Sequence, residues 1–277
     1  MSKKNDKPIL IYIGGYGRSG SSILEAALHT IIKDSSSLGE VATILDNIKS
    51  TRLGCACGDL NYSCAPWSKV RNLLRDKSVE IEFQRYSNKE MFGLSSDSAF
   101  AESYGFFWLK LFRLRTQNRV IIDSSKTSYR YCNRAKIMAE SNCYNVFFIH
   151  INRSVAGVLK SRLKGTNKKL SGVRDKRSLI IRVLSQLMWP VVTVISWNVA
   201  NHCAKKIYRS KYLSGKIEID FSLIRKDPLM SAKSISSEIE KQLNCTLDVD
   251  YNYAGPIVSG HSAEGNRSIR KLSMSRV

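Results

Sequence analysis

Acidic residues are scarce in this chain of 277 residues: 23 Asp and Glu stand against 44 Lys and Arg, and the formal net charge is +21. A field this positive attracts anions such as nucleotides, sulfated or phosphorylated glycans, acidic lipids and nucleic acid. A similar excess of charge also occurs in proteins for which it serves only solubility. The composition therefore favours an anionic partner without identifying it.

Long apolar runs are also lacking. The most apolar region, residues 179–200, is interrupted by Arg182, Gln186, Pro190 and Asn198, which argues against a membrane-spanning helix and predicts a buried helix with a kink near Pro190. The polar N-terminal stretch MSKKNDKP is followed by an apolar run too short for a secretory leader. We therefore expect a cytoplasmic protein, and peripheral contact with a membrane surface stays open.

The seven cysteines contain no C-x-x-C pair. Three of them, Cys55, Cys57 and Cys64, lie together in the stretch CACGDLNYSC. A zinc site would require a fourth ligand, and no nearby histidine in the sequence supplies one. The sequence therefore favours reduced thiols in a tight turn and no metal, with a Cys57–Cys64 bridge or a metal as the alternatives.

The chain has no internal repeat and no convincing linker, so we expect a single domain over residues 1–277, with helical insertions at about 40–118 and 164–210. Short apolar runs predict strands at 9–15, 119–123, 145–151 and 216–221. Helical periodicity follows at 21–33, 40–50, 67–75, 99–115, 129–141, 154–163, 178–208 and 230–243, and the basic stretch 164–177 is predicted to be a mobile loop. Strands that alternate with helices predict an α/β fold, a parallel sheet covered by helices on both faces.

The stretch GGYGRSGSS, residues 14–22, lies between the first predicted strand and the first predicted helix. Gly15 and Gly20 have the spacing of a Walker A phosphate loop, but Ser21 stands where that motif has its lysine, and Arg18 lies inside the loop. Backbone N–H groups of residues 17–22 at a helix N-terminus form an anion cradle, and Arg18 adds a fixed charge. A tight glycine turn without a ligand is the alternative.

A second polar segment follows the third predicted strand, in IHINRSVAGVLKSRL. Arg153 lies at the strand end, and Ser161 lies two helical turns later, so both side chains can face the same way. Ligands of parallel sheets bind outside the carboxyl ends of the strands, where this segment would meet the glycine loop. An arginine and a hydroxyl there suit a second phosphate, which ATP lacks and 3′-phosphoadenosine-5′-phosphosulfate (PAPS) carries on its ribose.

Together these two segments resemble PAPS-dependent sulfotransferases. GYGRSGSSIL is similar to their 5′-phosphosulfate loop, in the arginine form found in tyrosylprotein sulfotransferases and many bacterial members, and NRSVAGVLKS is similar to their 3′-phosphate motif. Weaker similarity to the bacterial group covers LGE, CACG with CAPW, IIDSSK and GHSAEGNRSIR. Ser222 departs from the family, which has an acidic residue at that position.

The resemblance implies in-line transfer of a sulfuryl group from PAPS to a hydroxyl or amine, without a metal and on a P-loop-like fold. Donor contacts are implied for the phosphate loop and the 3′-phosphate motif: Gly17, Arg18, Ser19, Gly20, Ser21, Ser22, Arg153 and Ser161. Arg267, in the C-terminal motif, is implied to close over the 3′-phosphate; a disordered basic tail is the alternative. Arg18 and Lys126 are candidates for stabilising the leaving group.

The acceptor requires a base, and Glu40 in LGE matches the place of a catalytic glutamate in the tyrosylprotein enzymes. An ordinary glutamate in a first helical turn is the alternative role for Glu40, and Asp123 is the second candidate for the base. His29, His150 and His202 are expected to be structural.

Two other classes of function compete with this interpretation. A P-loop kinase or NTPase would use Asp123 as a Walker B aspartate. A nucleic-acid-binding protein would use the +21 charge, but no nucleic-acid motif is present and aromatic residues do not alternate with the basic runs, so we expect no specific nucleic acid. The acceptor, whether small molecule, glycan or lipid, and the oligomeric state are not encoded in a readable motif.

Overall fold

The structure is a computed structural model that describes residues 7–45, 54–59, 63–91, 97–170, 179–258 and 260–262, without the side chains of 163–170 and 179–187. Its strands are β1 (Ile9–Gly14), β2 (Ser35–Gly39), β3 (Val120–Asp123), β4 (Asn145–Asn152) and β5 (Gly215–Asp220). Its α-helices are α1 (Ser21–Ile31), α3 (Ala65–Leu74), α4 (Lys77–Lys89), α5 (Ser98–Arg115), α6 (Arg134–Glu140), α7 (Val155–Leu170), α8 (Leu179–Tyr208), α9 (Phe221–Lys226) and α10 (Pro228–Leu243). Two 3₁₀ turns, η2 (Val41–Thr43) and η3 (Tyr129–Tyr131), complete the described elements.

All five strands pair in parallel, in the order β2-β3-β1-β4-β5. The central strand β1 is apolar on both faces and fully buried, as is typical of a strand covered by helices on both sides. Because all strands run the same way, their carboxyl ends meet along one edge. The predicted α/β fold with a parallel sheet is confirmed.

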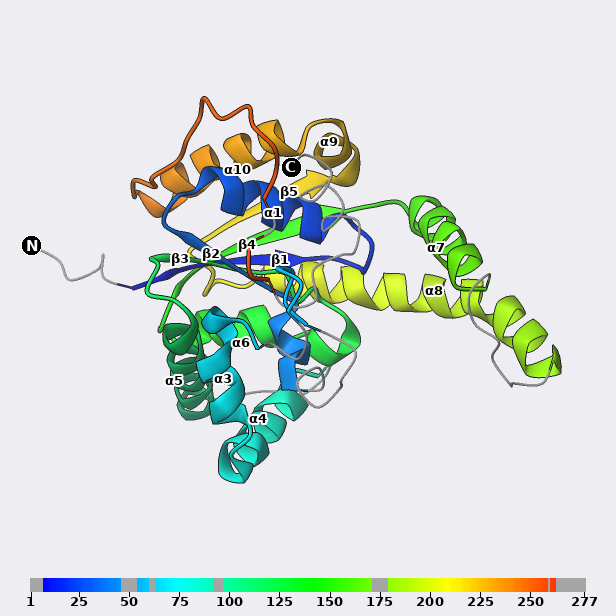
Figure 1. Cartoon of the computed structure of the whole chain (residues 1–277), viewed down its shortest axis with the longest axis horizontal. Coiled ribbons are helices and arrows are strands. Elements are labelled where there is room, and N and C mark those ends of the chain that lie inside the picture. The colour runs from blue at the N-terminus through cyan, green and yellow to red at the C-terminus, as the bar shows by residue number, and fades with distance from the viewer. Residues whose placement is uncertain are drawn as a thin grey trace, which may run out of the picture.

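Two hydrophobic cores lie on opposite faces of this sheet (Figure 1). On one face Ile9, Ile11 and Ile13 pack against α1 and α10. On the other face Leu10 packs with residues of α3, α4, α5 and α6. Adjacent residues of β1 thus serve opposite cores, which follows from the two-residue period of a strand.

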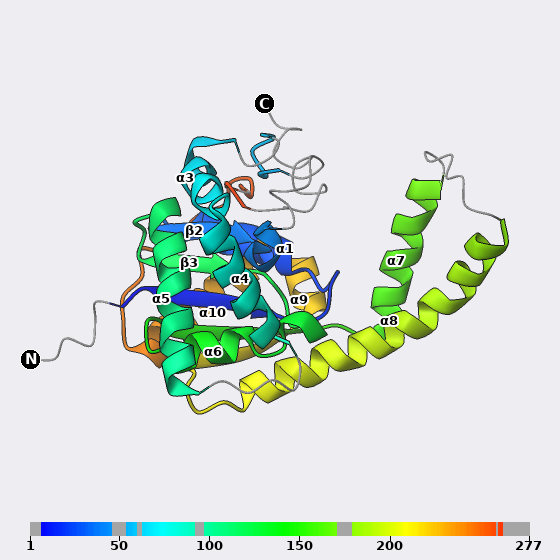
Figure 2. The same cartoon turned by 90° about the horizontal axis from the view of Figure 1, so that it is seen from below.

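Helix α7 and the N-terminal part of α8 project away from the α/β body and diverge from one another, while the C-terminal part of α8 packs against the body (Figures 1 and 2). The predicted loop at 164–177 is wrong over residues 164–170, which continue α7, while 171–177 lie outside the described residues. The predicted burial of the long helix is also wrong in part, because Met188, Val191 and Ile195 are exposed on α8. Among the described residues, no helix combines the length and the apolar character that crossing a membrane requires.

Strand β2 was not predicted, because its sequence SSSLG has none of the β-branched or aromatic residues that are enriched in strands. The structure buries these serines by giving each hydroxyl a partner. Ser35 Oγ donates to the carbonyl of Ile32 at 2.6 Å, and Ser36 Oγ lies 2.7 Å from Thr116 Oγ1. Helix α4 was also missed: its polar sequence buries only Phe83 and Tyr86.

Of the helix predicted over 40–50, the described part consists of the 3₁₀ turn η2 and two α-helical residues, 44 and 45, while 46–50 lie outside the described part of the chain. A disulfide joins Cys132, which follows η3, to Cys203 on α8. Cys55, Cys57 and Cys64 form no disulfide, as predicted.

Candidate functional site

The loop between β1 and α1 has a backbone that only certain residues allow. Gly20 has φ +91°, and a Cβ atom added there would lie 2.7 Å from the ring of Phe221, so the position requires glycine. Arg18 also has a positive φ, 67°, which is uncommon for an arginine and is typical of residues held for function. Its side chain is exposed on the cavity side of the loop.

The segment after β3 packs directly against this loop. The N–H of Gly15 donates to Thr127 Oγ1 at 3.0 Å, and the N–H of Thr127 donates to the carbonyl of Gly15 at 3.2 Å. Tyr12 donates its hydroxyl to the carbonyl of Lys126 at 2.6 Å, and Lys126 has φ 69°. These contacts fix the backbone of Lys126 beside the glycine loop.

A cavity of about 540 Å³ opens at this edge of the sheet. It is lined by Tyr16, Gly17, Arg18, Gly20, Ser21, Ser22, Ile23, Glu40, Lys126, Arg153, Ser161, Arg162 and Phe221. Five segments that are distant in the sequence therefore meet here, and they include the glycine loop and the segment after the third predicted strand, which were expected to meet. Ser19 is buried under the loop, and Arg267 lies outside the described residues.

Arg153 lines the cavity in direct contact with the glycine loop. Its Nη1 donates to the carbonyl of Arg18, its guanidinium stacks 3.9 Å from the centre of the Phe221 ring, and Trp197 Nε1 donates to its carbonyl at 2.9 Å. Burial, together with the positive charges of Arg225 and Arg18, lowers the pKa of Arg153. Like charges held this close are stabilised by an anion between them.

Neither Arg18 nor Arg153 has an acidic side chain within ion-pair distance in the described part of the chain. Two buried polar atoms at the site, Ser19 Oγ and Arg153 Nε, also have no hydrogen-bond partner among the described residues. Buried polar atoms are normally paired. The residues present therefore fit a ligand with several anionic oxygens.

Ser161 lines the same cavity from α7, two turns after Arg153, as predicted. The neighbouring Arg162 ties α7 to other elements: its Nη1 donates to Thr193 Oγ1 of α8 at 2.6 Å and to the hydroxyl of Tyr16 at 3.4 Å. The helical arm is thereby connected to the phosphate loop.

Glu40 and Lys126 form an ion pair at the mouth of the cavity, with Lys126 Nζ donating to Glu40 Oε1. Their side chains are 26% and 20% exposed, so both can be reached by a ligand in the cavity. The sequence did not predict that Glu40, the candidate base, pairs with Lys126, the candidate for stabilising the leaving group, because 86 positions separate the two residues.

Glu25 of α1 is a residue that the sequence analysis missed. It is buried, and its carboxylate accepts hydrogen bonds of 2.6 Å from Ser37 Oγ, the N–H of Gly39 and Ser124 Oγ. Burial raises the pKa of Glu25 to about 7, against the lowering effect of these donors. The contacts join the ends of β2 and β3 and thereby position Glu40, which directly follows Gly39. An acidic residue on the apolar face of a helix was the only available signal.

Asp123 does not reach the cavity, which corrects two of the predicted roles. It is fully buried and accepts hydrogen bonds from Arg134 Nη2 at 3.0 Å and Nε at 3.2 Å. Arg134 also donates to Glu90 at 2.7 Å and to the hydroxyl of Tyr104 at 2.8 Å. A carboxylate committed to a buried ion pair is available neither as the base nor as a Walker B ligand.

His150 is packed in the core as predicted, 1% exposed, with Asn201 Oδ1 at 3.2 Å and Glu218 Oε1 at 3.3 Å. Burial lowers the pKa of His150, against the raising effect of Asn201 and Glu218. No histidine is near the cysteine stretch in the sequence, but in the folded chain His261 lies beside it, 206 positions after Cys55.

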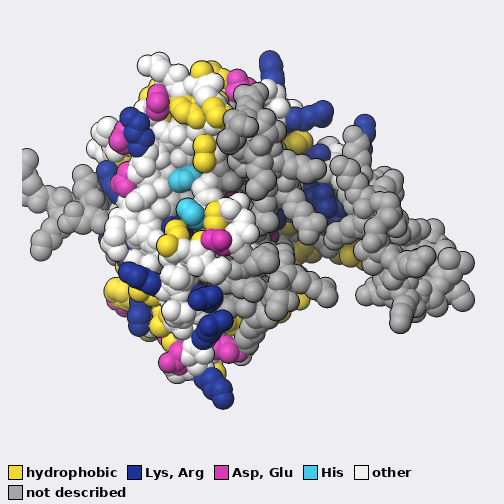
Figure 3. All heavy atoms as spheres, in the orientation of Figure 1, with side chains coloured by type: hydrophobic (Ala, Val, Ile, Leu, Met, Phe, Trp, Pro, Cys, Tyr) yellow, Lys and Arg dark blue, Asp and Glu magenta, His cyan; other side chains and the backbone are white. Residues whose placement is uncertain are grey.

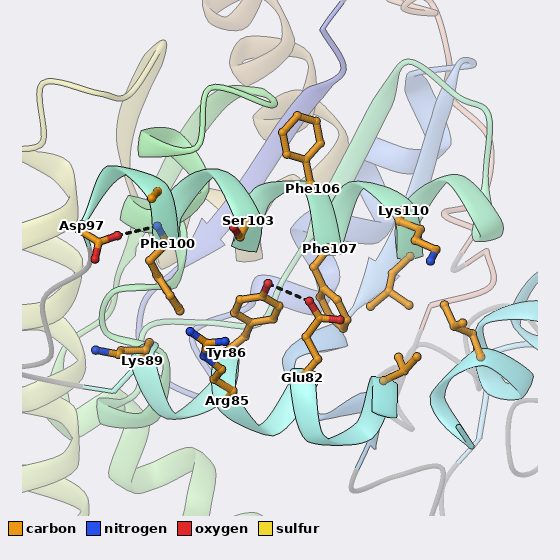
Figure 4. A pocket seen from close by; sticks show the side chains of 14 residues that line it. Glu82, Arg85, Tyr86, Lys89, Asp97, Phe100, Ser103, Phe106, Phe107 and Lys110 are labelled. Carbon is orange, nitrogen blue, oxygen red and sulfur yellow. Dashed lines mark hydrogen bonds between the residues drawn. The ribbon is translucent and has the colours of Figure 1, made fainter. Parts of the chain in front are cut away.

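A second and larger cavity, of about 980 Å³, lies between α4 and α5 (Figure 4). Aromatic side chains such as Tyr86 and Phe107 line it together with charged ones, and Tyr86 donates its hydroxyl to Glu82 at 2.9 Å. It shares no lining residue with the loop cavity and is not part of the anion site.

The surface in Figure 3 carries Lys and Arg side chains in several separate places, with Asp and Glu between them. Over the described residues of this face the basic side chains form no continuous stripe of the kind that tracks a nucleic-acid backbone.

No family model matches the chain, and no curated protein matches it in sequence. Among solved structures, a sulfotransferase domain from the Curacin biosynthetic pathway aligns with 95% of this chain and 89% of its own, at 16% identity and a TM-score of 0.49. A sulfotransferase domain from the olefin synthase of Synechococcus PCC 7002 aligns with 92% of this chain and 81% of its own, at 16% identity and a TM-score of 0.42. A sulfotransferase from Alicyclobacillus acidocaldarius aligns with 85% and 81%, at 12% identity and a TM-score of 0.42.

Proposed function

We propose that this chain is a PAPS-dependent sulfotransferase that moves a sulfuryl group to a hydroxyl or an amine. The observation that carries the proposal is the pair Arg18 and Arg153, which reach one cavity from two different strand ends without acidic partners among the described residues. Two separate cationic positions suit a donor with two separate anionic groups.

The glycine loop is the position for the 5′-phosphosulfate. Its N–H groups lie at the N-terminus of α1, where the helix dipole favours an anion, and Ser21 and Ser22 line the cavity beside Arg18. Arg153 and Ser161 are the position for the 3′-phosphate, which distinguishes PAPS from ATP. Arg267 is proposed to contribute from the C-terminal segment.

In the proposed reaction the acceptor oxygen or nitrogen attacks the sulfur atom, and the bond between sulfur and the bridging phosphate oxygen breaks. Negative charge develops on the 3′,5′-adenosine bisphosphate that leaves, where Arg18 and Lys126 stabilise it. The acceptor proton passes to Glu40, the carboxylate of the cavity that is not buried in a structural pair.

The ion pair between Lys126 and Glu40 implies that the donor binds before Glu40 is free to accept the acceptor's proton. An anionic donor competes with Glu40 for the Lys126 ammonium group, because both offer oxygens to the same cation. Binding of the donor would therefore release the Glu40 carboxylate for the acceptor.

A P-loop kinase is not favoured. Ser21 replaces the lysine that grips the β- and γ-phosphates, and Asp123 is held by Arg134 in the interior. Among its described residues, the cavity therefore has neither the phosphate-binding lysine nor the Walker B aspartate of a P-loop kinase.

The Arg153→Ala variant tests the proposal. It removes a charge-assisted contact of about 1.5–3 kcal/mol, so calorimetry should record at least a tenfold loss of affinity for 3′,5′-adenosine bisphosphate and little change for AMP. Arg209→Ala, which removes an exposed arginine at the end of α8, is the control and should change neither affinity. Equal losses for both nucleotides would show that Arg153 is structural.

The acceptor is proposed only as a class: a glycan, lipid or small molecule with a nucleophilic hydroxyl or amine. Incubating the protein with isotopically labelled PAPS and native extract, followed by mass spectrometry of sulfated products, identifies it. A parallel incubation with labelled ATP is the comparison. Transfer of labelled phosphate from ATP to a product of the extract would support the kinase instead.

A further inference from the structure

Four side chains with metal-binding atoms converge beside the start of α3. The thiols of Cys55, Cys57 and Cys64 and the imidazole of His261 place one ligand atom each within 4.8 Å of all the others. Cys55 Sγ and His261 Nδ1 are 3.7 Å apart. A tetrahedral zinc ion, with Zn–S of about 2.3 Å and Zn–N of about 2.0–2.1 Å, separates a sulfur from a nitrogen ligand by about 3.6 Å.

The backbone turn that carries the first two cysteines is well defined. The N–H of Cys55 donates to the carbonyl of Asp59 at 2.9 Å, and the N–H of Gly58 donates to the carbonyl of Cys55 at 3.1 Å. Gly58 has φ +105°, a conformation that favours glycine. The turn brings the thiols of Cys55 and Cys57 to the same side as Cys64.

Cys64 is the N-cap residue of α3, and its side chain makes no capping hydrogen bond. Its carbonyl accepts hydrogen bonds from the N–H groups of Trp67 and Ser68, so its backbone is fixed.

His261 is held in place from the other end of the chain. Its carbonyl accepts hydrogen bonds from Trp67 Nε1 at 2.6 Å and from Arg115 Nη2 at 3.2 Å. The N–H of Ala56 donates to the carbonyl of Ser262 at 2.9 Å. These hydrogen bonds hold His261 next to the cysteine turn.

The charges of the neighbourhood also suit a bound metal. Three thiolates and one divalent zinc ion carry a net charge of −1, and Arg115, which stacks 5.1 Å from the Trp67 ring, supplies a positive charge next to them. Sulfur ligands with one imidazole select zinc over magnesium or calcium. Four protein ligands leave no open position, as in structural rather than catalytic zinc sites.

We propose that Cys55, Cys57, Cys64 and His261 bind one structural zinc ion, which fastens the C-terminal segment to the turn before α3. This site is independent of sulfuryl transfer. The zinc ion would hold the chain at residue 261, six positions before Arg267. The segment that leads to Arg267 would therefore start from an anchored residue.

Metal analysis of the full chain, purified under reducing conditions without a histidine tag, tests the site. Elemental analysis should give one zinc per chain. Replacing zinc by cobalt should give the visible bands of a tetrahedral ion and a thiolate-to-metal charge-transfer band. A mercurial reagent that blocks thiols should release the zinc to a coloured chelator.

Matched variants separate coordination from folding. His261→Ala should lose at least nine tenths of the zinc, while His261→Cys, which keeps a fourth ligand, should retain it. Cys245→Ser removes a thiol outside the cluster and should also retain it. Wild-type protein with well under one zinc per chain and no charge-transfer band would overturn the proposal. A disulfide among Cys55, Cys57 and Cys64 in the intact mass, or retention of zinc by His261→Ala, would do the same.

Discussion

The loop cavity and the buried layer beneath it use the same kinds of residue in opposite ways. In the cavity, Arg18 is exposed and Arg153 is partly buried, and neither has an acidic partner among the described residues; the one ion pair, Glu40 with Lys126, is partly exposed. In the layer below, Asp123, Arg134 and Glu90 are all 1% exposed or less and are bonded to one another. Unpaired charge next to solvent is available for a ligand, whereas paired charge in the interior holds the scaffold.

The two regions share a border at the ends of β2 and β3. Gly39 donates its N–H to the buried Glu25, and the next residue, Glu40, reaches the cavity. Asp123 ends β3 in the interior, and Lys126, three residues later, lines the cavity. Substitutions on the cavity side should therefore change chemistry, and those below it should change stability.

The largest effect is expected at Glu40. Glu40→Gln keeps the shape and removes the basicity, so the rate at which 3′,5′-adenosine bisphosphate is released from PAPS should fall about a hundredfold or more. Affinity for that nucleotide should stay within about twofold, because its contacts lie on the two arginine motifs. The free energy of unfolding should change by less than about 1 kcal/mol, since the ion pair with Lys126 is partly exposed. Normal turnover would remove Glu40 from the chemistry.

Asp123→Asn is the counterpart in the buried layer. Removing one partner from a buried ion pair costs about 3–5 kcal/mol of unfolding free energy, measured by denaturant titration. Turnover of the folded protein at low temperature should be nearly unchanged. The control is Asp248→Asn, which breaks an ion pair with Lys33 whose side chains are both 64% exposed and should cost less than about 1 kcal/mol. A stable but inactive Asp123→Asn protein would contradict the division between the two regions.

Glu25 lies on the border between the cavity and the buried layer, and its raised pKa predicts that the stability of the fold depends on pH. Its pKa is raised from 4.5 to about 7 in the folded state, so between these values the folded chain binds more protons than the unfolded chain. The contribution of Glu25 is complete below pH 4.5 and is lost as the pH rises through about 7, a change of about 3 kcal/mol.

Glu25→Gln keeps the side-chain shape but does not titrate. The difference in unfolding free energy between wild type and this variant should therefore decline from pH 4.5 to about 7. A difference that stays flat would show that the donors from Ser37, Gly39 and Ser124 keep Glu25 ionised throughout.

Much of the fold and of the cavity could be predicted from the sequence because the signals are local. The apolar strands β1, β3 and β4, the glycine loop and the spacing of Arg153 and Ser161 each lie within about fifteen residues, where strand and helix periods apply directly. Once the sheet is parallel, the carboxyl ends of its strands meet, and the candidate residues meet with them.

Other features depended on partners distant in the chain. The serines of β2 indicate a strand only once their hydroxyls are paired in the interior. Asp123 could be a base, a metal ligand or a structural anion until Arg134 is placed against it. The three cysteines acquire a fourth ligand only when folding brings His261 across 206 positions. The sequence by itself determined the class of fold and the anion loop, because these follow from backbone periods and glycine conformations; the tertiary structure decided which carboxylate stays in solvent and which thiols gain a histidine, because burial and long-range contact are properties of the folded chain.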